Sequence, residues 1–389
     1  MRHLTLICGS VLFAASHANA ELIINGQAVS SSPVTTTQDT TYTPNSNFQS
    51  CIANLRSQAV SSGVSGSTYD RYTQNLTPDY SVISKLDYQP EFSTPIWDYL
   101  SGLVDEERVE KGRQMLSQHR DVLNRVAAAY GVPAETVVAV WGVESEFFAT
   151  MRILQRGDLR EDQLKGSWAG AFGHTQFMPS TYEELAVDFD GDGRRDLVSS
   201  TSDALASTAN FLKKRGWQTG MPWGFEVKIP AGASVSGESR RNKKSLSSWV
   251  NRGFTRVDGT PIIQGNLSEG SQAGLMMPAG ANGPAFLVFK NFDAIYSYNA
   301  AESYALAIAH LSDRLQGKGG FQTAWPTEDA GTSRAERREI QNYLLKKGYA
   351  IGDADGLIGD KTRQAIQQEQ VKLGLSPTGR AGQQILKAI

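Results

Sequence analysis

The amino-acid sequence predicts a mainly α-helical protein with a small β-rich insert and a small three-helix domain at its C-terminus. Apolar residues recur at helical spacing from Phe48 to about Ala128, and again up to Glu144. Short alternating runs replace this pattern between Trp223 and Phe292, which is typical of strands. A Gly-, Thr- and Pro-containing linker then separates the last helical segments from the rest of the chain.

Composition and charge are those of an ordinary globular protein. The chain has 389 residues, of which 40% are hydrophobic and 20% charged, and its formal net charge is −2. This length is enough for two domains and a third, small one. The near-neutral balance supplies no electrostatic attraction for nucleic acid, so no nucleic-acid partner is expected.

The first residues predict export. Arg2 and His3 precede an apolar run, and Ala18-Asn19-Ala20 follows it, as in a secretory signal peptide (1–20) cleaved after Ala20. The run is too short to cross a bilayer, so a periplasmic protein without a transmembrane segment is expected. An unusual N-terminal core helix is the alternative. Residues 21–47, rich in Ser, Thr, Asn and Pro, predict a flexible leader.

Helical periodicity defines the first half of the mature chain. Amphipathic helices are predicted at 47–56, 95–104 and 106–130. Gly131-Val132-Pro133 interrupts the pattern, and Pro133 sits where its missing N–H costs nothing, in the first turn of a helix that ends at Glu144.

The second half repeats the pattern around the β-rich insert. Helices are predicted at 200–225 and 293–315, before and after the insert. The linker covers 317–333. Beyond it, residues 334–389 contain two amphipathic helices and a short last one, which predicts a separate domain.

Glu144 is the first candidate functional residue. On helical spacing it shares a face with Val137, Val140 and Trp141, so it is expected to point inward. Burial against apolar groups raises the pKa of a carboxyl group, which suits a general acid near neutral pH. The alternative is a glutamate at a frayed helix end that reaches water.

A glycine-rich stretch, Gly166 to Ser180, is the second candidate. It reads GSWAGAFGHTQFMPS, in which small residues permit close approach and Ser167 and Gln176 supply hydrogen-bonding groups. Phe177 and Met178 add an apolar wall. A sugar site needs this combination of room, polar groups and a stacking face. A purely structural connection is the alternative.

Four motifs in the chain are specific. They are GSWAGAFGHTQFMPSTY from Gly166, VWGVES ending at Ser145, DFDGDGRRDL from Asp188, and Tyr298-Asn299 followed by SYALA from Ser303. They closely resemble the motifs of the lytic murein transglycosylase B family. The resemblance covers roughly Phe48 to Leu315, in order and with similar spacing. The C-terminal segment, with Ile340-Gln-Asn-Tyr-Leu and Asp355-Gly-Leu-Ile-Gly-Asp, resembles the peptidoglycan-binding type 1 domain.

The resemblance implies a lysozyme-like fold and a peptidoglycan lytic transglycosylase. It makes 48–316 the catalytic domain and 334–389 a peptidoglycan-binding domain. Such an enzyme cleaves the β-1,4 bond between N-acetylmuramic acid and N-acetylglucosamine without water and leaves a 1,6-anhydro ring. Glu144 matches the family's single catalytic carboxyl group, which acts as acid and then as base. No cofactor is required for this chemistry. The expected partners are glycan strands and, as candidates, other cell-wall enzymes.

Further site residues follow from the same motif match. Two polar residues are implied to contact the substrate or Glu144, two apolar ones to form the cleft wall, and several aromatic ones to line the groove. Phe211 stands where some members carry Tyr, so it can stack but not donate. Core packing is the alternative for each tyrosine. The polar residues are Ser167 and Gln176, the residues of the cleft wall are Phe177 and Met178, and the aromatic residues of the groove are Tyr99, Phe211, Tyr298 and Tyr304.

A candidate calcium loop follows the glycine-rich stretch. Asp188, Asp190 and Asp192-Gly193 match the first half of a calcium-binding loop, and Asp203 matches an acidic position farther along. Ser199 stands at the twelfth position, where a bidentate Glu is expected. The alternative is a structural Asp-Gly turn without an ion.

One departure from the family lies directly after the catalytic motif. Relatives continue beyond Phe147 with a long segment beside the active site, and most of it is absent here. This leaves two other readings open. One is a non-catalytic peptidoglycan-binding protein with a degenerate catalytic domain, and the other is a hydrolytic muramidase.

Overall fold

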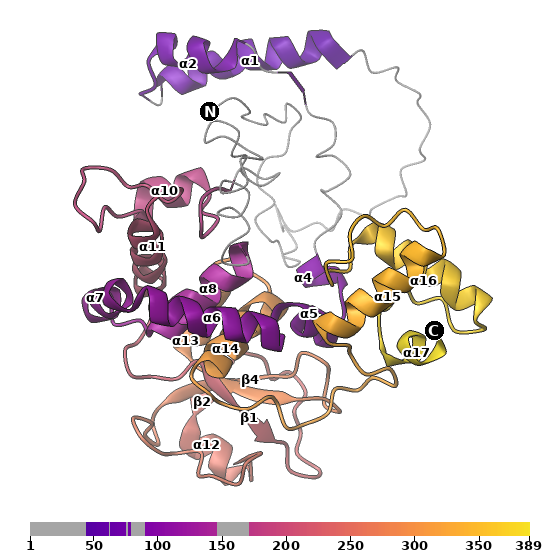
Figure 1. Ribbon diagram of the computed structural model, residues 1–389. Helices are drawn as coiled ribbons and strands as arrows, with labels where there is room; N and C mark the ends of the chain where they lie inside the picture. Colours follow the sequence, from indigo (N-terminus) through magenta and orange to yellow (C-terminus); the bar gives the residue numbers. More distant parts are fainter. Residues whose placement is uncertain (1–43, 62, 75–76, 79–89, 146–170) are drawn as a thin grey trace, which may run out of the picture. The chain divides into compact units, whose positions relative to one another are not determined.

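A computed structural model describes residues 44–61, 63–74, 77–78, 90–145 and 171–389 (Figure 1). The predicted signal peptide, most of the leader, Ser167 and the segment after Phe147 lie outside these residues. The chain forms two compact units, Met1–Asp87 with Leu154–Ala171, and Tyr88–Ile153 with Phe172–Ile389. Each unit is described by itself.

The described part of the first unit is a helical hairpin. Helix α1 (Pro44–Ser61) begins inside the last residues of the predicted leader, and α2 (Gly66–Thr73) packs against it. Phe48 and Ile52 are buried between the helices against Tyr69. This contact explains why apolar spacing begins at Phe48.

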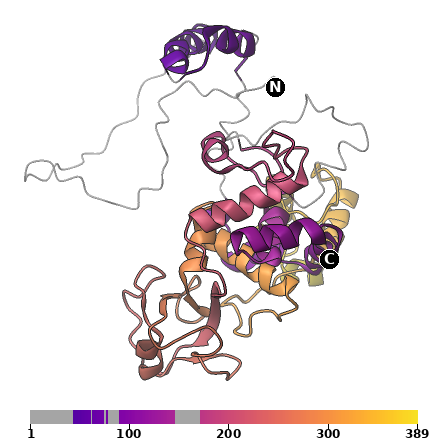
Figure 2. The same cartoon turned by 90° about the vertical axis from the view of Figure 1, so that its left-hand side faces the viewer.

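The second unit is built on a bundle of helices. Helix α14 packs along α8, and α6 and α11 lie against α8 as well (Figures 1 and 2). The helices before the insert are α4 (Pro90–Ser93), α5 (Ile96–Leu103), α6 (Glu106–Gln118), α7 (Arg120–Tyr130), α8 (Ala134–Ser145), α10 (Pro179–Leu185) and α11 (Thr201–Lys214). Those after it are α13 (Lys290–Tyr296) and α14 (Glu302–Leu315).

Helix α8 forms the centre of this bundle. All five residues from Val137 to Trp141 are at most 1% exposed, so the helix is buried on every side there and not on one face alone. Its apolar residues belong to a core shared with α5, α11 and α14. A helix that is hydrophobic all round is expected at the middle of a core. The buried face that carries Glu144 is therefore placed deep in the unit.

Three predicted helices are shorter than their patterns. The predicted helix 106–130 is divided at His119, whose ring packs edge-on against Trp141 at 5.4 Å. The predicted helix 200–225 ends at Lys214, because Gly216 adopts a left-handed φ of 94°. The predicted helix 293–315 is broken near Ala300, which has a φ of 49°. Tertiary contacts and local backbone conformation override the apolar spacing at these points.

The β-rich insert is a five-stranded antiparallel sheet in the order β2-β4-β5-β1-β3. Leu287 pairs with Phe225 on one side and Leu275 on the other. Its own core surrounds Trp249 and Phe289. Its elements are β1 (Gly224–Lys228), β2 (Lys244–Ser245), α12 (Leu246–Asn251), β3 (Thr255–Arg256), β4 (Gln272–Met276) and β5 (Ala285–Val288).

The C-terminal domain contains α15 (Arg334–Lys346), α16 (Asp360–Lys372) and α17 (Gln383–Ala388). Ile340, Ile366 and Ile385, one from each helix, are completely buried in its core. Ser333 and Glu336 form a capping box at the start of α15. The mainly helical fold with a small β insert and three C-terminal helices is thus confirmed.

Within the described ranges, no single helix is long and apolar enough to cross a membrane. One bent pair, Arg120–Tyr130 with Ala134–Glu144, meets the length and composition of a span, with 112° between its two helices. Much of this pair is core, since Leu123, Val126 and the middle of α8 are buried.

Candidate active site

Glu144 lies near the C-terminal end of α8, opposite Tyr304 on α14. The Tyr304 hydroxyl donates a hydrogen bond to Oε1 of Glu144. Because α14 packs along α8 and Tyr304 itself is only 3% exposed, the hydroxyl is held by the core. The pairing is therefore a consequence of helix packing, joining residues 160 positions apart in the chain.

The environment of Glu144 favours its protonated form. Burial raises the pKa of its carboxyl group to about 7, against the opposing effect of the Tyr304 hydrogen bond. The negative charge of Glu91 raises this pKa further. A carboxyl group that is half protonated near neutral pH can both donate and accept a proton there.

A pocket of about 500 Å³ opens in front of this carboxyl group. On the helical side its lining includes Asp98, Tyr99, Glu144, Asn299 and Tyr304. Glu144 is therefore partly accessible at the pocket although its carboxyl group is enclosed by protein. Among the described residues, this opening gives a reacting atom a route to the carboxyl group.

The predicted tyrosines gather at the same place. Tyr298 stacks on Tyr304 with ring centroids 6.4 Å apart, and its hydroxyl donates to the carbonyl of Thr175 at 2.7 Å. Burial raises the pKa of Tyr99, Tyr298 and Tyr304, and the nearby Glu144 raises each of them too. All three phenols consequently remain neutral hydrogen-bond donors at any working pH.

The described part of the glycine-rich stretch forms a tight loop. Phe172 and Phe177 form an antiparallel bridge, with N···O distances of 3.0 Å in both directions. Gly173, with a φ of 78°, is required because a Cβ there would lie 2.5 Å from the carbonyl oxygen of Leu197. Gln176 has a φ of 51° and donates from Nε2 to the Gly173 carbonyl at 2.8 Å. Non-glycine residues in this conformation are characteristic of functional loops.

The apolar residues after this loop divide between core and surface. Phe177 is 1% exposed and Phe211 5%, and both rings pack against Tyr298, at 6.0 and 4.6 Å. Met178 is 41% exposed. The structure thus corrects the expectation for two rings: Phe177 and Phe211 support Tyr298 from the core and do not face the opening. For Phe177 the physical reason is alternation, since it and Met178 are adjacent on an extended segment and point to opposite sides. Phe211 lies on the buried part of helix α11.

Two residues near the pocket were not among the predicted site residues. Glu91, on α4, accepts a hydrogen bond from Nδ2 of Asn299 at 3.3 Å. Asn299 follows Tyr298 within a family-like motif, so its place near the pocket could have been predicted from the sequence. Glu91 carries no sequence signal, because it is brought to the pocket only by tertiary packing. Ser167 lies outside the described residues, so its predicted role stays a prediction.

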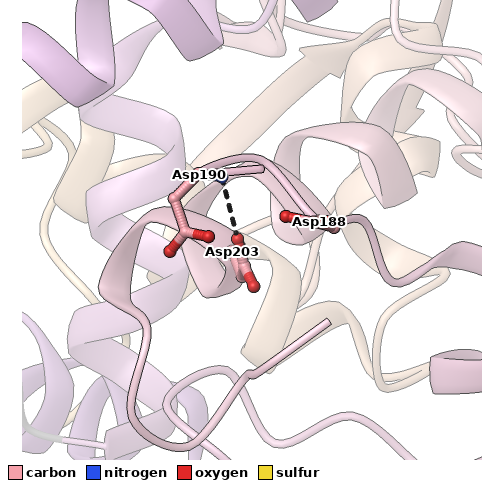
Figure 3. A group of neighbouring side chains, drawn as sticks. All are labelled: Asp188, Asp190 and Asp203. Carbon is pink, nitrogen blue, oxygen red and sulfur yellow. Dashed lines mark hydrogen bonds between the residues drawn. The ribbon is translucent and has the colours of Figure 1, made fainter. Parts of the chain in front are cut away.

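The candidate calcium loop brings three of its four predicted residues together (Figure 3). One carboxylate oxygen each of Asp188, Asp190 and Asp203 lie within 4.8 Å of one another. Asp203 is completely buried and accepts backbone N–H bonds from Phe189, Asp190 and Asp196. The predicted ligand Asp192 is not in the cluster and instead accepts from the N–H of Arg194.

Oxygen ligands of like charge at this spacing fit a hard divalent cation such as calcium. The same contacts also stabilise the loop without an ion, since the exposed Asp188 accepts N–H bonds from Gly191 and Gly193 at 2.7 and 2.9 Å. Ser200, next to the twelfth loop position, donates to Asp190 at 2.6 Å. The acidic cluster therefore fits a calcium site, but it supplies fewer carboxylate ligands than a complete calcium-binding loop.

Comparison with protein families identifies both parts of the chain. The family model described as the transglycosylase SLT domain matches residues 47–151 and 144–313. A peptidoglycan binding domain model matches residues 333–389. The two transglycosylase matches overlap at 144–151, next to the point where the sequence predicts a shortened segment.

Known relatives agree with the family models. Membrane-bound lytic murein transglycosylase B of Escherichia coli is 32% identical over 251 residues, which are 56% of this chain and 66% of that protein. The structure of SltB3 from Pseudomonas aeruginosa in complex with NAG-anhNAM-pentapeptide is 41% identical and has a TM-score of 0.66. That match covers 87% of this chain and 98% of the other.

A calcium complex is also among the similar structures. The Escherichia coli lytic transglycosylase Slt35 in complex with calcium is 26% identical and has a TM-score of 0.55. The match covers 68% of this chain and 92% of the other. Calcium, the ion in that complex, is a cation that the carboxylate oxygens of Asp188, Asp190 and Asp203 in this chain would suit.

Proposed function

Because this chain belongs to the transglycosylase SLT domain family, we propose that it is a lytic transglycosylase that cleaves peptidoglycan glycan strands without water. The observation that carries the proposal is the buried carboxyl group of Glu144, which lines the pocket. Glu144 has a pKa of about 7 and is paired with Tyr304, so it is poised for proton transfer in both directions.

The reaction begins with Glu144 as general acid. Its proton passes to the oxygen that links C1 of N-acetylmuramic acid to N-acetylglucosamine, and the C1–O bond breaks. The acetamido oxygen of the same muramic acid stabilises the electron-poor C1, as in substrate-assisted glycosidases. Tyr304 then donates its hydrogen bond to the newly ionised carboxylate.

The second step closes the anhydro ring. The Glu144 carboxylate removes the proton of the C6 hydroxyl while O6 bonds to C1. The product ends in 1,6-anhydro-N-acetylmuramic acid, and Glu144 is protonated again for the next turnover. No water and no cofactor enter the balance, so one carboxyl group is sufficient.

The remaining predicted residues are assigned to binding. Tyr99 combines a ring with a neutral hydroxyl at the pocket, Tyr298 stacks behind Tyr304, and exposed Met178 supplies apolar surface. Gln176 is assigned to the substrate, with Ser167 as its predicted companion. Phe177 and Phe211 act through Tyr298, against which both rings pack. A structural calcium ion is assigned to Asp188, Asp190 and Asp203.

Export to the periplasm completes the proposed function. It rests on the signal-peptide pattern ending at Ala20 and on the peptidoglycan binding domain at 333–389, whose ligand lies outside the cytoplasm. N-terminal sequencing of the mature protein from a periplasmic extract tests it. A first residue of Glu21 is expected, and retention of Met1 would contradict the proposal.

Digestion of purified sacculi tests the activity. We expect wild-type protein to release muropeptides that end in an anhydro ring, detected by mass spectrometry, and Glu144→Gln to release none. Products with reducing-end muramic acid would instead indicate a hydrolytic muramidase. Equally blank digests from both proteins, with both still pelleting with sacculi, would indicate a wall-binding protein and not an enzyme.

A further inference from the structure

The pocket at Glu144 is formed by two domains. Its lining includes Glu144 and Tyr99 from the helical bundle, and the turn Gly356–Gly359 with Ala381 from the C-terminal domain. All of these residues belong to the second compact unit. The wall-binding domain therefore lies at the same opening as the proposed catalytic acid.

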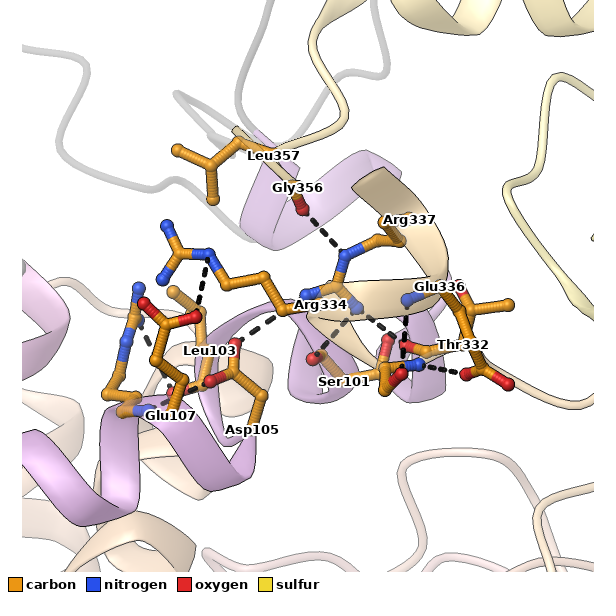
Figure 4. A network of polar contacts seen from close by, with 12 residues as sticks. Ser101, Leu103, Asp105, Glu107, Thr332, Arg334, Glu336, Arg337, Gly356 and Leu357 are labelled. Carbon is orange, nitrogen blue, oxygen red and sulfur yellow. Dashed lines mark hydrogen bonds and ion pairs between the residues drawn. The ribbon is translucent and has the colours of Figure 1, made fainter. Parts of the chain in front are cut away.

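A buried arginine fixes this arrangement (Figure 4). Arg337 is 5% exposed and lies 3.5 Å from the carboxylate of Asp105, which begins α6. Its guanidinium also donates to the carbonyl oxygens of Ser101 at 3.3 Å, Thr332 at 2.6 Å and Gly356 at 2.7 Å. One side chain thus ties the pocket turn of the C-terminal domain to α5 and α6.

Two further ion pairs join the same two domains. Nε of Arg380 donates to Asp98 at 2.8 Å, and Nη2 of Arg338 donates to Glu107 at 2.9 Å. Asp98 is adjacent to Tyr99 on α5. Three contacts of this kind specify one relative orientation of the two domains, because each requires charge and geometry to match.

We propose that the C-terminal domain forms the second wall of the catalytic pocket and contacts the peptide-bearing sugar next to the bond that is cleaved. The inference rests on the proposed function and deepens it. A flexibly tethered wall-binding module would raise only the local concentration of the enzyme on insoluble wall. A docked wall also contributes to binding a short soluble chain, and this difference can be measured.

Gly359 offers a clean way to fill the pocket from the C-terminal side. It has a φ of −83° and a ψ of 179°, which any residue adopts, and a Cβ there would meet no atom within 4 Å. Gly359→Trp therefore adds an indole to the pocket lining from a position where the new Cβ displaces no atom. Gly270→Trp is the matched control, since its Cβ also meets nothing and it is not part of the pocket lining.

The experiment measures kcat and KM on short, soluble, peptide-bearing glycan chains, and pelleting with sacculi. For Gly359→Trp we expect kcat/KM on soluble chains to fall by about tenfold or more, with folding and pelleting retained. Gly270→Trp should match wild type. Unchanged turnover of soluble chains by Gly359→Trp would overturn the inference.

A second variant keeps the test decisive if Gly359→Trp fails to fold. Leu357 lines the pocket and is 38% exposed, so Leu357→Ala leaves the core of its domain intact. It should raise KM for soluble chains by about threefold to tenfold with little change in kcat. An unchanged KM would count against the inference. Failure of wild type to form anhydro products would refute the proposed function instead, so the two failures are distinguishable.

Discussion

At the scale of residues, the proposed chemistry depends on the balance of two effects on one carboxyl group. Burial of Glu144 favours the neutral acid, while the hydrogen bond from Tyr304 favours the carboxylate. Burial is the larger effect, and the pKa is held at about 7. A general acid that must become a base within one turnover needs a pKa near the working pH.

Replacing Glu144 should remove both activity and a pH response. Glu144→Gln is expected to lower kcat by about 10²–10⁴-fold, the usual contribution of general acid–base catalysis. Wild-type activity should fall as pH rises through about 7, because the acid loses its proton. The pKa of Glu144 is raised from 4.5 to about 7 in the folded protein, so between these pH values the folded state holds a proton that the unfolded state has lost. The free energy of unfolding of wild type should therefore fall, relative to that of Glu144→Gln, as pH rises from 4.5 to about 7. Urea unfolding at several pH values measures this; parallel stability curves would contradict it.

Removing one hydroxyl should move the pH profile. Tyr304→Phe deletes the hydrogen bond that lowers the pKa of Glu144, so this pKa should rise and the alkaline limb of kcat should move to higher pH. The rate should fall by about tenfold, the effect of losing a hydrogen bond to a charged group. Tyr130→Phe, a residue outside the pocket lining, is the control. An alkaline limb at the wild-type pH would show that the contact does not tune the acid.

At the scale of elements, the loop between α10 and α11 is shaped by hydrogen bonds from its backbone to acidic side chains, and the same side chains form the oxygen cluster. The buried Asp203 accepts three backbone N–H bonds and so shapes the loop from within. The exposed Asp188 and Asp190 complete the oxygen cluster. A cation there would offset repulsion among the carboxylates and thereby stabilise the fold.

Calcium should therefore raise the melting temperature. At a hundredfold excess over Kd the expected stabilisation is about 2.7 kcal/mol, equivalent to several degrees. Asp190→Asn removes one exposed oxygen ligand and should abolish most of the shift. Asp192→Asn, which lies outside the cluster, should leave it unchanged. Differential scanning calorimetry with calcium and with a chelator decides the matter. If calcium does not change the melting temperature of wild type, the loop is a purely structural turn that binds no ion.

At the scale of the whole molecule, the second unit joins two domains through buried charge. Arg337 and Asp105 are 5% and 9% exposed, so neither charge is well solvated without the other. Such pairs contribute more to orientation than to net stability, because desolvation offsets most of their attraction.

Breaking this pair from one side should be costly. Arg337→Met leaves Asp105 buried and uncompensated, and should lower the free energy of unfolding by about 3–5 kcal/mol. Asp105 also caps α6 by accepting from the N–H of Arg108, and Asn can perform that role. The double variant with Asp105→Asn should therefore lose less than the sum of the single losses. Additive losses in urea unfolding would argue against a coupled pair.

The sequence by itself determined the class of this protein. Helical spacing, the alternating runs and the linker predicted a helical protein with a β insert and three C-terminal helices, and the structure confirms them. The family resemblance is confirmed as well. These features were predictable because they depend on local periodicity and on short motifs. The inward position of Glu144 was predictable for the same reason, since the face it lies on is set by neighbours three, four and seven residues away.

Only the tertiary structure decided what surrounds that carboxyl group. It placed Tyr304 against Glu144, turned Phe177 into the core, brought Glu91 near the acid and left Asp192 outside the acidic cluster. It also set the turn at Gly356 beside the same pocket. Each of these outcomes joins residues that are distant in sequence or depends on how a loop folds back. No local pattern specifies such contacts, because they arise from the packing of whole helices and from charges paired across domains.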